Sequence, residues 1–287
     1  MRPLTTYLAC ATLLLAVAGR SEAQEAPPKG RLFALAIGID RYQHVPRVDF
    51  GDLDARLIAE TLVERAGARS ENVRLLSDSS PAERRPTKAV IAAALTKFLG
   101  EPQEQDQVLV FFAGHGLYDD GNTYLVALDS KADNVESMIP LSFVRGLLES
   151  CKAERKLFVV DACHSGNAAG IGPKQRLGLT KADLEAGLGN DNRVYTLASC
   201  QADELSISHK PKSQGLYTYW LSRGLAGAAD SDGDGVILAD ELHQFVEPLV
   251  KKTALREYQH PQSPARIVPP ASKTPVLPLE PESETNT

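Results

Sequence analysis

The sequence predicts an α/β fold in which a mainly parallel sheet lies between two layers of helices. Apolar runs of strand length alternate with helical segments along most of the 287 residues, which is the pattern of βαβ units. Two of these runs, 108–114 and 157–162, lead directly into a histidine and a cysteine. Because parallel strands end at one common edge, where α/β proteins place their chemistry, these two residues are expected to lie side by side.

The first predicted strand covers residues 32–39. The segment 54–66 has apolar residues at helical spacing and is followed by Gly67, a common stop signal, so a helix is expected there. A second strand is predicted at 73–77. A second helix should begin after Thr87, whose hydroxyl suits the N-cap position.

The third predicted strand ends at His115, and a turn at 119–122 joins it to another extended segment. Ser142 opens a third predicted helix, and the strand that ends near Cys163 follows. The last predicted elements are a strand at 193–199, a helix at 216–225 and an apolar helix at 242–250.

The first 23 residues have the features of an export signal: Arg2, an apolar run at 8–18, and small residues before the expected cleavage point. The apolar run is short for a transmembrane helix, although an uncleaved anchor is the alternative interpretation. We expect the mature chain to begin near Gln24 and to be exported, either to a periplasm or into the medium.

The remaining 264 residues are enough for one α/β domain with a large core, which we place at 31–265. Residues 24–30 are expected to be a linker. The segment 266–287 is rich in proline and glutamate and is predicted to be a disordered tail.

Without residues 1–23 the chain has 29 lysines and arginines against 36 aspartates and glutamates, a net charge of −7. This balance argues against a nucleic-acid partner, which would require a basic face. No membrane contact is expected beyond the export signal. Three cysteines remain, so at least one thiol is unpaired; Cys151 and Cys200 are expected to pack as small buried groups.

His115 and Cys163 are the candidate catalytic pair. A thiol is a strong nucleophile only as the thiolate, and an imidazole can take its proton and later donate it to a leaving amine. The pair therefore predicts acyl transfer, in particular peptide-bond hydrolysis. No third residue that orients His115 is apparent in the sequence.

The sequence resembles the caspase-like cysteine peptidases, peptidase family C14, in their metacaspase and paracaspase branch. The resemblance is carried by His115-Gly116 and by Asp161-Ala-Cys163-His-Ser-Gly, with a spacing of 48 residues between histidine and cysteine. It extends from 31–40 to 260–264. It implies a three-layer α-β-α caspase-like fold, a cysteine endopeptidase with a Cys/His dyad, and an oxyanion hole made by the amides of Gly116 and Cys163.

Asp161 lies two residues before Cys163, so its side chain points to the same side of the strand. A carboxylate beside the nucleophile favours a cationic side chain just before the scissile bond. The resemblance implies the same preference, for Arg or Lys, and matches Asp54 to a second carboxylate of the pocket. For Asp54 a helix N-cap is an equally good interpretation.

The segment 165–192 is rich in glycine and alanine and contains Lys174, Arg176 and Lys181. Basic residues in such a segment suggest a linker that the enzyme itself could cleave.

Residues 230–241 match the twelve-residue EF-hand calcium loop, with Gly235 at the sharp turn. An acidic surface turn is the alternative. A single loop of this kind predicts weak Ca²⁺ affinity, and no cofactor is expected for the chemistry itself. The predicted ligands are Asp230, Asp232, Asp234, the carbonyl of Val236, and Glu241 with both oxygens.

A second hypothesis is a catalytically silent caspase-like module that acts by binding a partner or calcium. The intact pair of His115 and Cys163 argues against it.

Overall fold

Six strands form the central sheet, in the order β13-β9-β7-β3-β1-β2. Five of them are parallel, and the short edge strand β13 runs antiparallel to β9. The computed structural model describes residues 30–162, 175–189, 193–201, 204–268, 270 and 273–279. In sheet order the strands are β13 (Ala265–Ile267), β9 (Tyr195–Ala198), β7 (Arg155–Asp161), β3 (Gln107–Ala113), β1 (Leu32–Gly38) and β2 (Val73–Ser77).

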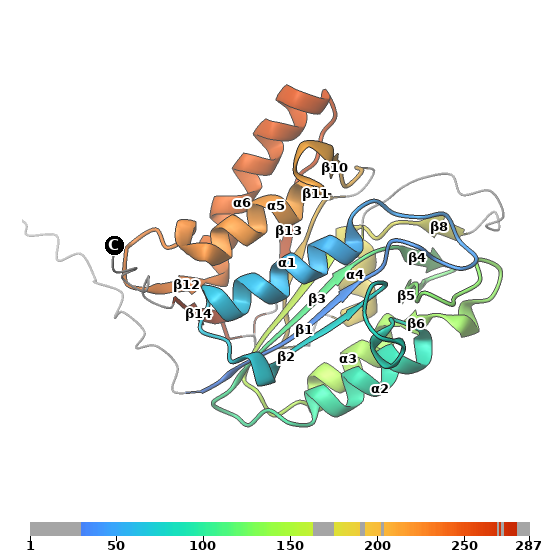
Figure 1. Ribbon diagram of the computed structural model, residues 1–287, viewed down its shortest axis with the longest axis horizontal. Coiled ribbons are helices and arrows are strands. Elements are labelled where there is room, and N and C mark those ends of the chain that lie inside the picture. Colours follow the sequence, from blue (N-terminus) through green and yellow to red (C-terminus); the bar gives the residue numbers. More distant parts are fainter. Residues whose placement is uncertain are drawn as a thin grey trace, which may run out of the picture.

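Helices cover both faces of this sheet, which confirms the predicted three-layer architecture. Figure 1 shows α1, α5 and α6 on one face and α2 and α3 on the other; α4 packs against α3 and contributes to the same core as α2 and α3. The helices are α1 (Gly51–Glu64), α2 (Lys88–Leu99), α3 (Leu141–Ser150), α4 (Lys181–Leu188), α5 (Leu216–Arg223) and α6 (Ala239–Thr253).

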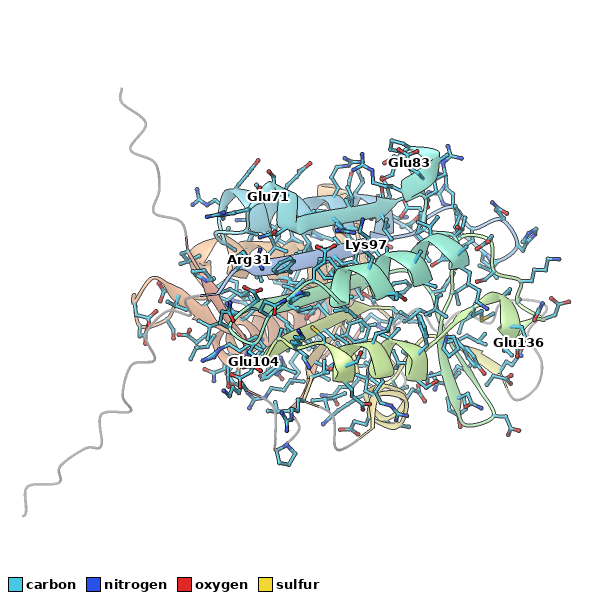
Figure 2. The ribbon with its side chains drawn as sticks, turned by 90° about the horizontal axis from the view of Figure 1, so that it is seen from below. Arg31, Glu71, Glu83, Lys97, Glu104 and Glu136 are labelled. Carbon is cyan, nitrogen blue, oxygen red and sulfur yellow. The ribbon has the colours of Figure 1, made fainter. Side chains whose placement is uncertain are left out.

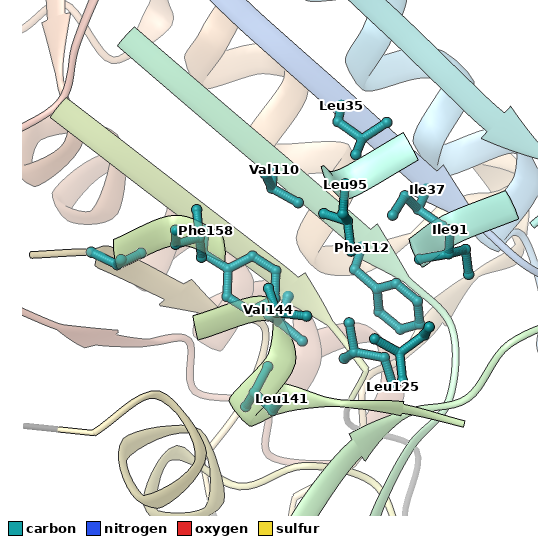
Figure 3. Packing of buried hydrophobic residues seen from close by; sticks show 14 of the residues in the cluster. Leu35, Ile37, Ile91, Leu95, Val110, Phe112, Leu125, Leu141, Val144 and Phe158 are labelled. Atoms are coloured by element: carbon teal, nitrogen blue, oxygen red, sulfur yellow. The ribbon is translucent and has the colours of Figure 1, made fainter. Parts of the chain in front are cut away.

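The strands are apolar at nearly every position because both faces of the sheet are buried. Along β1, Leu35 and Ile37 join the core beside α2 and α3, while Ala34 and Ala36 join the core beside α1, α5 and α6. Figure 3 shows the first of these cores, where Leu35 and Ile37 lie near the α2 side chains, one of which is Leu95. This double burial holds the strands and their ends in place.

A second, smaller sheet begins where β3 ends. The chain leaves β3 at Ala113 and enters β4 at Gly116, so His115 lies between the two sheets. The hairpin predicted at 119–122 is present between β4 and β5. The four strands, in the order β6-β5-β4-β8, are β6 (Ile139–Pro140), β5 (Asn122–Leu125), β4 (Gly116–Asp119) and β8 (Gln175–Leu177).

Short elements complete the described chain. Two small antiparallel pairs are β10 (Ser208–His209) with β11 (Gln214–Gly215), and β12 (Val236–Leu238) with β14 (Val276–Pro278). Four 3-10 turns are η1 (Ser70–Asn72), η2 (Ala82–Arg84), η3 (Val135–Ser137) and η4 (Lys210–Lys212), and two π-helical turns are η5 (Gly224–Ala228) and η6 (Ala254–Tyr258).

The prediction of a disordered tail from residue 266 is wrong for two segments. Residues 266 and 267 belong to β13, which pairs with β9, and 276–278 form β14, which pairs with β12. Backbone pairing with strands far away in the sequence orders these segments despite their proline-rich composition. Residues 1–29, which include the predicted export signal, lie outside the described residues.

Within the segment 165–192, the described residues 175–189 form a strand and a helix. Arg176 lies in β8 and is ion-paired with Asp183 at 2.5 Å, and Lys181 is the first residue of α4. Thr180 and Asp183 form a capping box at the start of that helix. Cleavage at Arg176 or Lys181 would therefore require local unfolding, while Lys174 lies outside the described residues.

Among the described residues, no helix combines the length and the apolar composition needed to span a membrane.

Candidate active site

The carboxyl ends of β3 and β7 lie side by side, as the sequence predicts. Ala113 pairs with Asp161 in the register of the two strands, and the amide of Gly114 donates to the carbonyl of Asp161 at 3.1 Å. His115 is the next residue on one chain segment, and Cys163 follows Asp161 by two residues on the other. Cys163 itself, and the amide it would contribute to an oxyanion hole, lie outside the described residues.

His115 is held by two groups of the loop that follows β1. Its amide donates to the hydroxyl of Tyr42 at 2.6 Å, and the two rings pack with their centroids 5.1 Å apart. Its Nε2 lies 2.9 Å from the carbonyl oxygen of Pro46. Only 5% of the His115 residue is exposed, so the imidazole has a defined orientation before any substrate arrives.

The contact with Pro46 determines the tautomer of His115. A carbonyl oxygen only accepts hydrogen bonds, so Nε2 must carry the proton. In the neutral ring, Nδ1 is then the nitrogen that can accept a proton from a thiol. The carbonyl of Pro46 is the group that orients His115, and the sequence did not reveal it. It acts through its main chain, so no side-chain pattern could have indicated it.

Gly116 is the first residue of β4, and its lack of a side chain has a packing reason. A Cβ at this position would lie 2.2 Å from Cγ of Leu179. The segment of Leu179 also joins the two strand ends: its amide donates to the carbonyl of Ala162 at 3.3 Å, and the amide of Gly178 donates to the carbonyl of Gly116 at 2.9 Å. Gly116 is therefore fixed close to the residue that precedes Cys163.

Asp54 and Asp161, which are predicted to bind the basic side chain of the substrate, lie close together beside Gly215. A Cβ on Gly215 would lie 2.9 Å from Oδ2 of each carboxylate, so both oxygens face the same small space. Asp54 is not an N-cap: α1 begins three residues earlier, after Phe50, and Asp54 lies within its first turn. The capping alternative for Asp54 is wrong.

Both carboxylates are 97% buried and are held by polar hydrogens from other elements. Asp161 accepts from the hydroxyl of Ser206 at 2.6 Å and from that of Thr218 at 3.0 Å. Asp54 accepts from the amide of Gly215 at 3.0 and 3.1 Å. Ser206, Thr218 and Gly215 were not singled out from the sequence, because nothing in the sequence shows that residues so far along the chain reach this place.

The burial and mutual repulsion of the Asp54 and Asp161 carboxylates favour a positively charged partner. Burial raises the pKa of Asp54 well above its ordinary value, and the negative charge of Asp161 raises it further, while the amide of Gly215 acts in the opposite direction. Neither carboxylate has a lysine or arginine as an ion-pair partner within the described part of the chain. A cavity of about 10 Å³ lies beside them, lined by Ser206 and Gly215 among others, and holds about one water molecule.

The predicted calcium loop has a conformation that brings its carboxylates together. Oxygens of Asp230, Asp232 and Asp234 lie within 4.8 Å of one another. Gly235 has a φ of 82°, a left-handed value that glycine adopts without strain. Asp230 accepts the amide of Gly235 at 3.0 Å, which closes the turn.

Glu241 lies at the other end of this loop and does not belong to that three-residue group. Its Oε1 accepts the amide of Ser231 at 3.1 Å, and its Oε2 accepts the amide of Leu238 at 3.0 Å. Val236 is the first residue of β12. The residues present fit a cation that is bound by oxygen atoms, since three carboxylates converge and a fourth lies across the loop.

A buried, oriented imidazole at one strand end and a buried carboxylate pair at the next, on a helix-covered parallel sheet, define a protein of the caspase-like class. Comparison with known families agrees. Residues 31–267 match the family model described as "Caspase domain", Peptidase_C14. The chain therefore belongs to the caspase-domain family C14.

Relatives of known name are metacaspases. Over 155 residues the chain is 30% identical to Metacaspase-1 of one strain of Cryptococcus neoformans var. neoformans serotype D, and over 158 residues it is 28% identical to that of another. Metacaspase-1 of Eremothecium gossypii is 28% identical over 152 residues. Each match covers 48% of this chain and about a third of the relative, 32% or 33%.

Among solved structures, one of a protein from Geobacter sulfurreducens superimposes with a TM-score of 0.56 at 15% identity. The superposition covers 83% of this chain and 92% of the other. At this identity the likeness shows a shared fold.

Proposed function

We propose that this protein is a cysteine endopeptidase that cleaves peptide bonds after arginine or lysine. The observation that carries the proposal is the pair of Asp54 and Asp161, which is buried, faces one small space and has no cationic partner within the described residues. Burying two acidic groups without a cation is costly. A guanidinium or ammonium from a substrate would supply the missing charge.

The reaction proposed is acyl transfer to sulfur followed by hydrolysis. Nδ1 of His115 accepts the thiol proton of Cys163, and the thiolate attacks the carbonyl carbon of the substrate. The amides of Gly116 and Cys163 stabilise the resulting oxyanion. His115 then protonates the leaving amine, which breaks the peptide bond, and a water molecule hydrolyses the thioester and regenerates the thiol.

The proposed preference for arginine or lysine implies that the substrate pocket must open when the side chain enters. The cavity beside the carboxylates holds about one water molecule, so a lysine or arginine side chain must displace neighbouring groups as it enters. Thr218 donates to Oδ2 of Asp161, the oxygen that faces Gly215, so the incoming cation would share that oxygen with the hydroxyl and would also meet Oδ2 of Asp54.

Cleavage of fluorogenic peptides that differ only in the residue before the cut tests this proposal. Wild type should cleave the Arg and Lys peptides and leave the Asp peptide intact, and Cys163→Ala should cleave none. Asp161→Asn should lower kcat/KM for the Arg peptide by about 100-fold or more, because it leaves a buried cation without its partner. A preference for the Asp peptide would refute the pocket assignment.

The rival proposal is a silent caspase-like module that acts through a partner or through calcium. Absence of cleavage of every peptide, with and without calcium, would favour it. The defined tautomer of His115 and the shared edge of β3 and β7 support the enzyme.

We further propose that the loop 230–241 binds Ca²⁺. The convergence of the Asp230, Asp232 and Asp234 oxygens and the left-handed Gly235 support this site. The ion would be held by those carboxylates, the carbonyl of Val236 and Glu241, and it would stabilise the start of α6. Weak affinity suits an exported protein, which is the location proposed from residues 1–23.

A further inference from the structure

A second pocket lies at the opposite edge of the central sheet, where β7 begins. It has a volume of about 240 Å³. The wall of the pocket is formed in part by the segment 151–154, between α3 and β7, and the amide of Glu154 donates to the carbonyl of Glu104 at 3.2 Å. Figure 2 shows Glu104 and Arg31 toward one end of the molecule and Glu136 at the other end. Six charged residues line the pocket: Glu149, Lys152, Glu154, Lys156, Arg193 and Lys273.

Lys156 is the unusual member of this set. It is the second residue of β7 and is only 4% exposed. Its ammonium makes no hydrogen bond or ion pair within the described residues, and burial lowers its pKa. A nearly enclosed lysine without an ion-pair partner is unfavourable. Because Lys156 also lines the pocket, a negatively charged ligand there would stabilise it.

The acidic residues of the pocket form no ion pair with Lys156 within the described residues, although the charge of Glu149 acts on it from a distance. Glu154 is ion-paired with Lys273, and Oε1 of Glu149 lies 3.8 Å from Nε of Arg145, on the preceding turn of α3. The thiol of Cys151 also lines the pocket, and burial raises its pKa, so it stays neutral.

Three cations therefore remain in the pocket without an ion pair among the described residues: Lys152, Lys156 and Arg193. They gather in a chain whose net charge is −6. Lys152 and Arg193 are exposed and can approach a ligand, while Lys156 is a nearly enclosed residue at the pocket wall. An arginine fork combined with a lysine point charge is a common way to hold an oxyanion.

We propose that this pocket binds a phosphate group, either free phosphate or the phosphate of a small ester. The group would accept hydrogen bonds from Lys156 and Arg193 and would neutralise the charge of the nearly enclosed Lys156. Its double negative charge matches a pocket with three uncommitted cations and two paired carboxylates. The volume exceeds that of the phosphate alone, so part of an ester would fit beside it.

The site is separate from the proposed peptidase centre. Lys156 and Asp161 stand at opposite ends of β7, five residues and about 16 Å apart. The proposal therefore does not depend on peptide cleavage, and a protein without any peptidase activity could still bind phosphate here.

Titration of the full chain with inorganic phosphate, followed by calorimetry and by the melting temperature, tests the site. Chloride at equal ionic strength is the reference. Wild type should bind phosphate, and Lys156→Met should weaken the affinity at least tenfold. Lys97→Met, an exposed lysine on α2 that removes the same charge elsewhere, should leave it unchanged. Arg193→Gln, an exposed change that leaves the core intact, should also weaken binding.

Glycerol phosphate, titrated in parallel, distinguishes the two sources of the ligand. Tighter binding of the ester identifies an esterified ligand, and tighter binding of inorganic phosphate identifies the free ion. Equal responses to phosphate and chloride in wild type would overturn the proposal. So would a Lys156→Met protein that is folded and binds phosphate as wild type does.

Discussion

The imidazole of His115 is oriented by the main chain of Pro46, 69 residues earlier, through a 2.9 Å contact between Nε2 and the carbonyl oxygen. The loop after β1 therefore determines which ring nitrogen is available for proton transfer. Since the orienting group is a carbonyl, the side chain at position 46 can change without loss of the contact.

This relationship predicts opposite results for two substitutions. His115→Ala should lower kcat on an Arg peptide by about 10²–10⁴-fold, the usual contribution of a general acid–base group. Pro46→Ala keeps the carbonyl and should retain activity within a few-fold. Steady-state kinetics of both variants, with circular dichroism to check folding, measure this. An inactive but folded Pro46→Ala protein would contradict the role given to the carbonyl.

Gly215→Ala should damage the substrate pocket. A Cβ there would lie 2.9 Å from both carboxylates, so it would occupy the space into which a basic side chain must reach. We expect a higher KM for Arg and Lys peptides. Gly146→Ala is the matched control, because its Cβ would meet nothing within 4 Å on the surface of α3. It should stabilise the fold by up to about 1 kcal/mol and leave KM unchanged. Equal KM values for the two variants would argue against the pocket.

Asp54→Asn should change how stability depends on pH. The folded pKa of Asp54 is raised by burial and by Asp161. The folded state therefore binds this proton more tightly than the unfolded state, and the free energy of unfolding falls as the pH rises from about 4 through the raised pKa. Asn keeps the carbonyl acceptor for Gly215 and cannot ionise.

The melting temperature, measured from pH 4 to pH 8, checks this expectation. The variant should gain stability over wild type as the pH rises and lose the advantage near pH 4. A constant difference across the range would show that ionisation of Asp54 is not the cause.

Glu241→Gln should weaken Ca²⁺ binding to the loop 230–241, because it removes the charge of the ligand expected to give two oxygens. Isothermal titration should show a drop of tenfold or more relative to wild type. Glu247→Gln serves as the control: Glu247 pairs with Lys251 at 2.8 Å on the exposed side of α6. Identical heats for wild type and Glu241→Gln would exclude the loop as a calcium site.

Much of the fold could be predicted because its signals are local. Apolar runs marked the parallel strands, and Thr87 marked the start of α2, where its hydroxyl accepts the amide of Val90. The same reasoning missed α4, although Thr180 and Asp183 have the spacing of a capping box. The glycines around these residues favoured a linker instead of a helix.

The parts of the site that could not be predicted depend on contacts between distant segments. Gly215 reaches Asp54 across 161 residues, and Ser206 reaches Asp161 across 45. The carbonyl of Pro46 belongs to the main chain and is the same for any residue type. The order of β14 likewise comes from pairing with β12, a strand 40 residues away along the chain.

That pairing has a consequence for work with shortened versions of the protein. Ile237 sits opposite Leu277 and belongs to the core beside α6. Removing the residues after 272 would expose the apolar side chain of Ile237. It would also leave the main-chain hydrogen-bonding groups of β12 unpaired, next to the acidic loop 230–241. Exposed strand edges pair with other chains, so a truncated protein should self-associate.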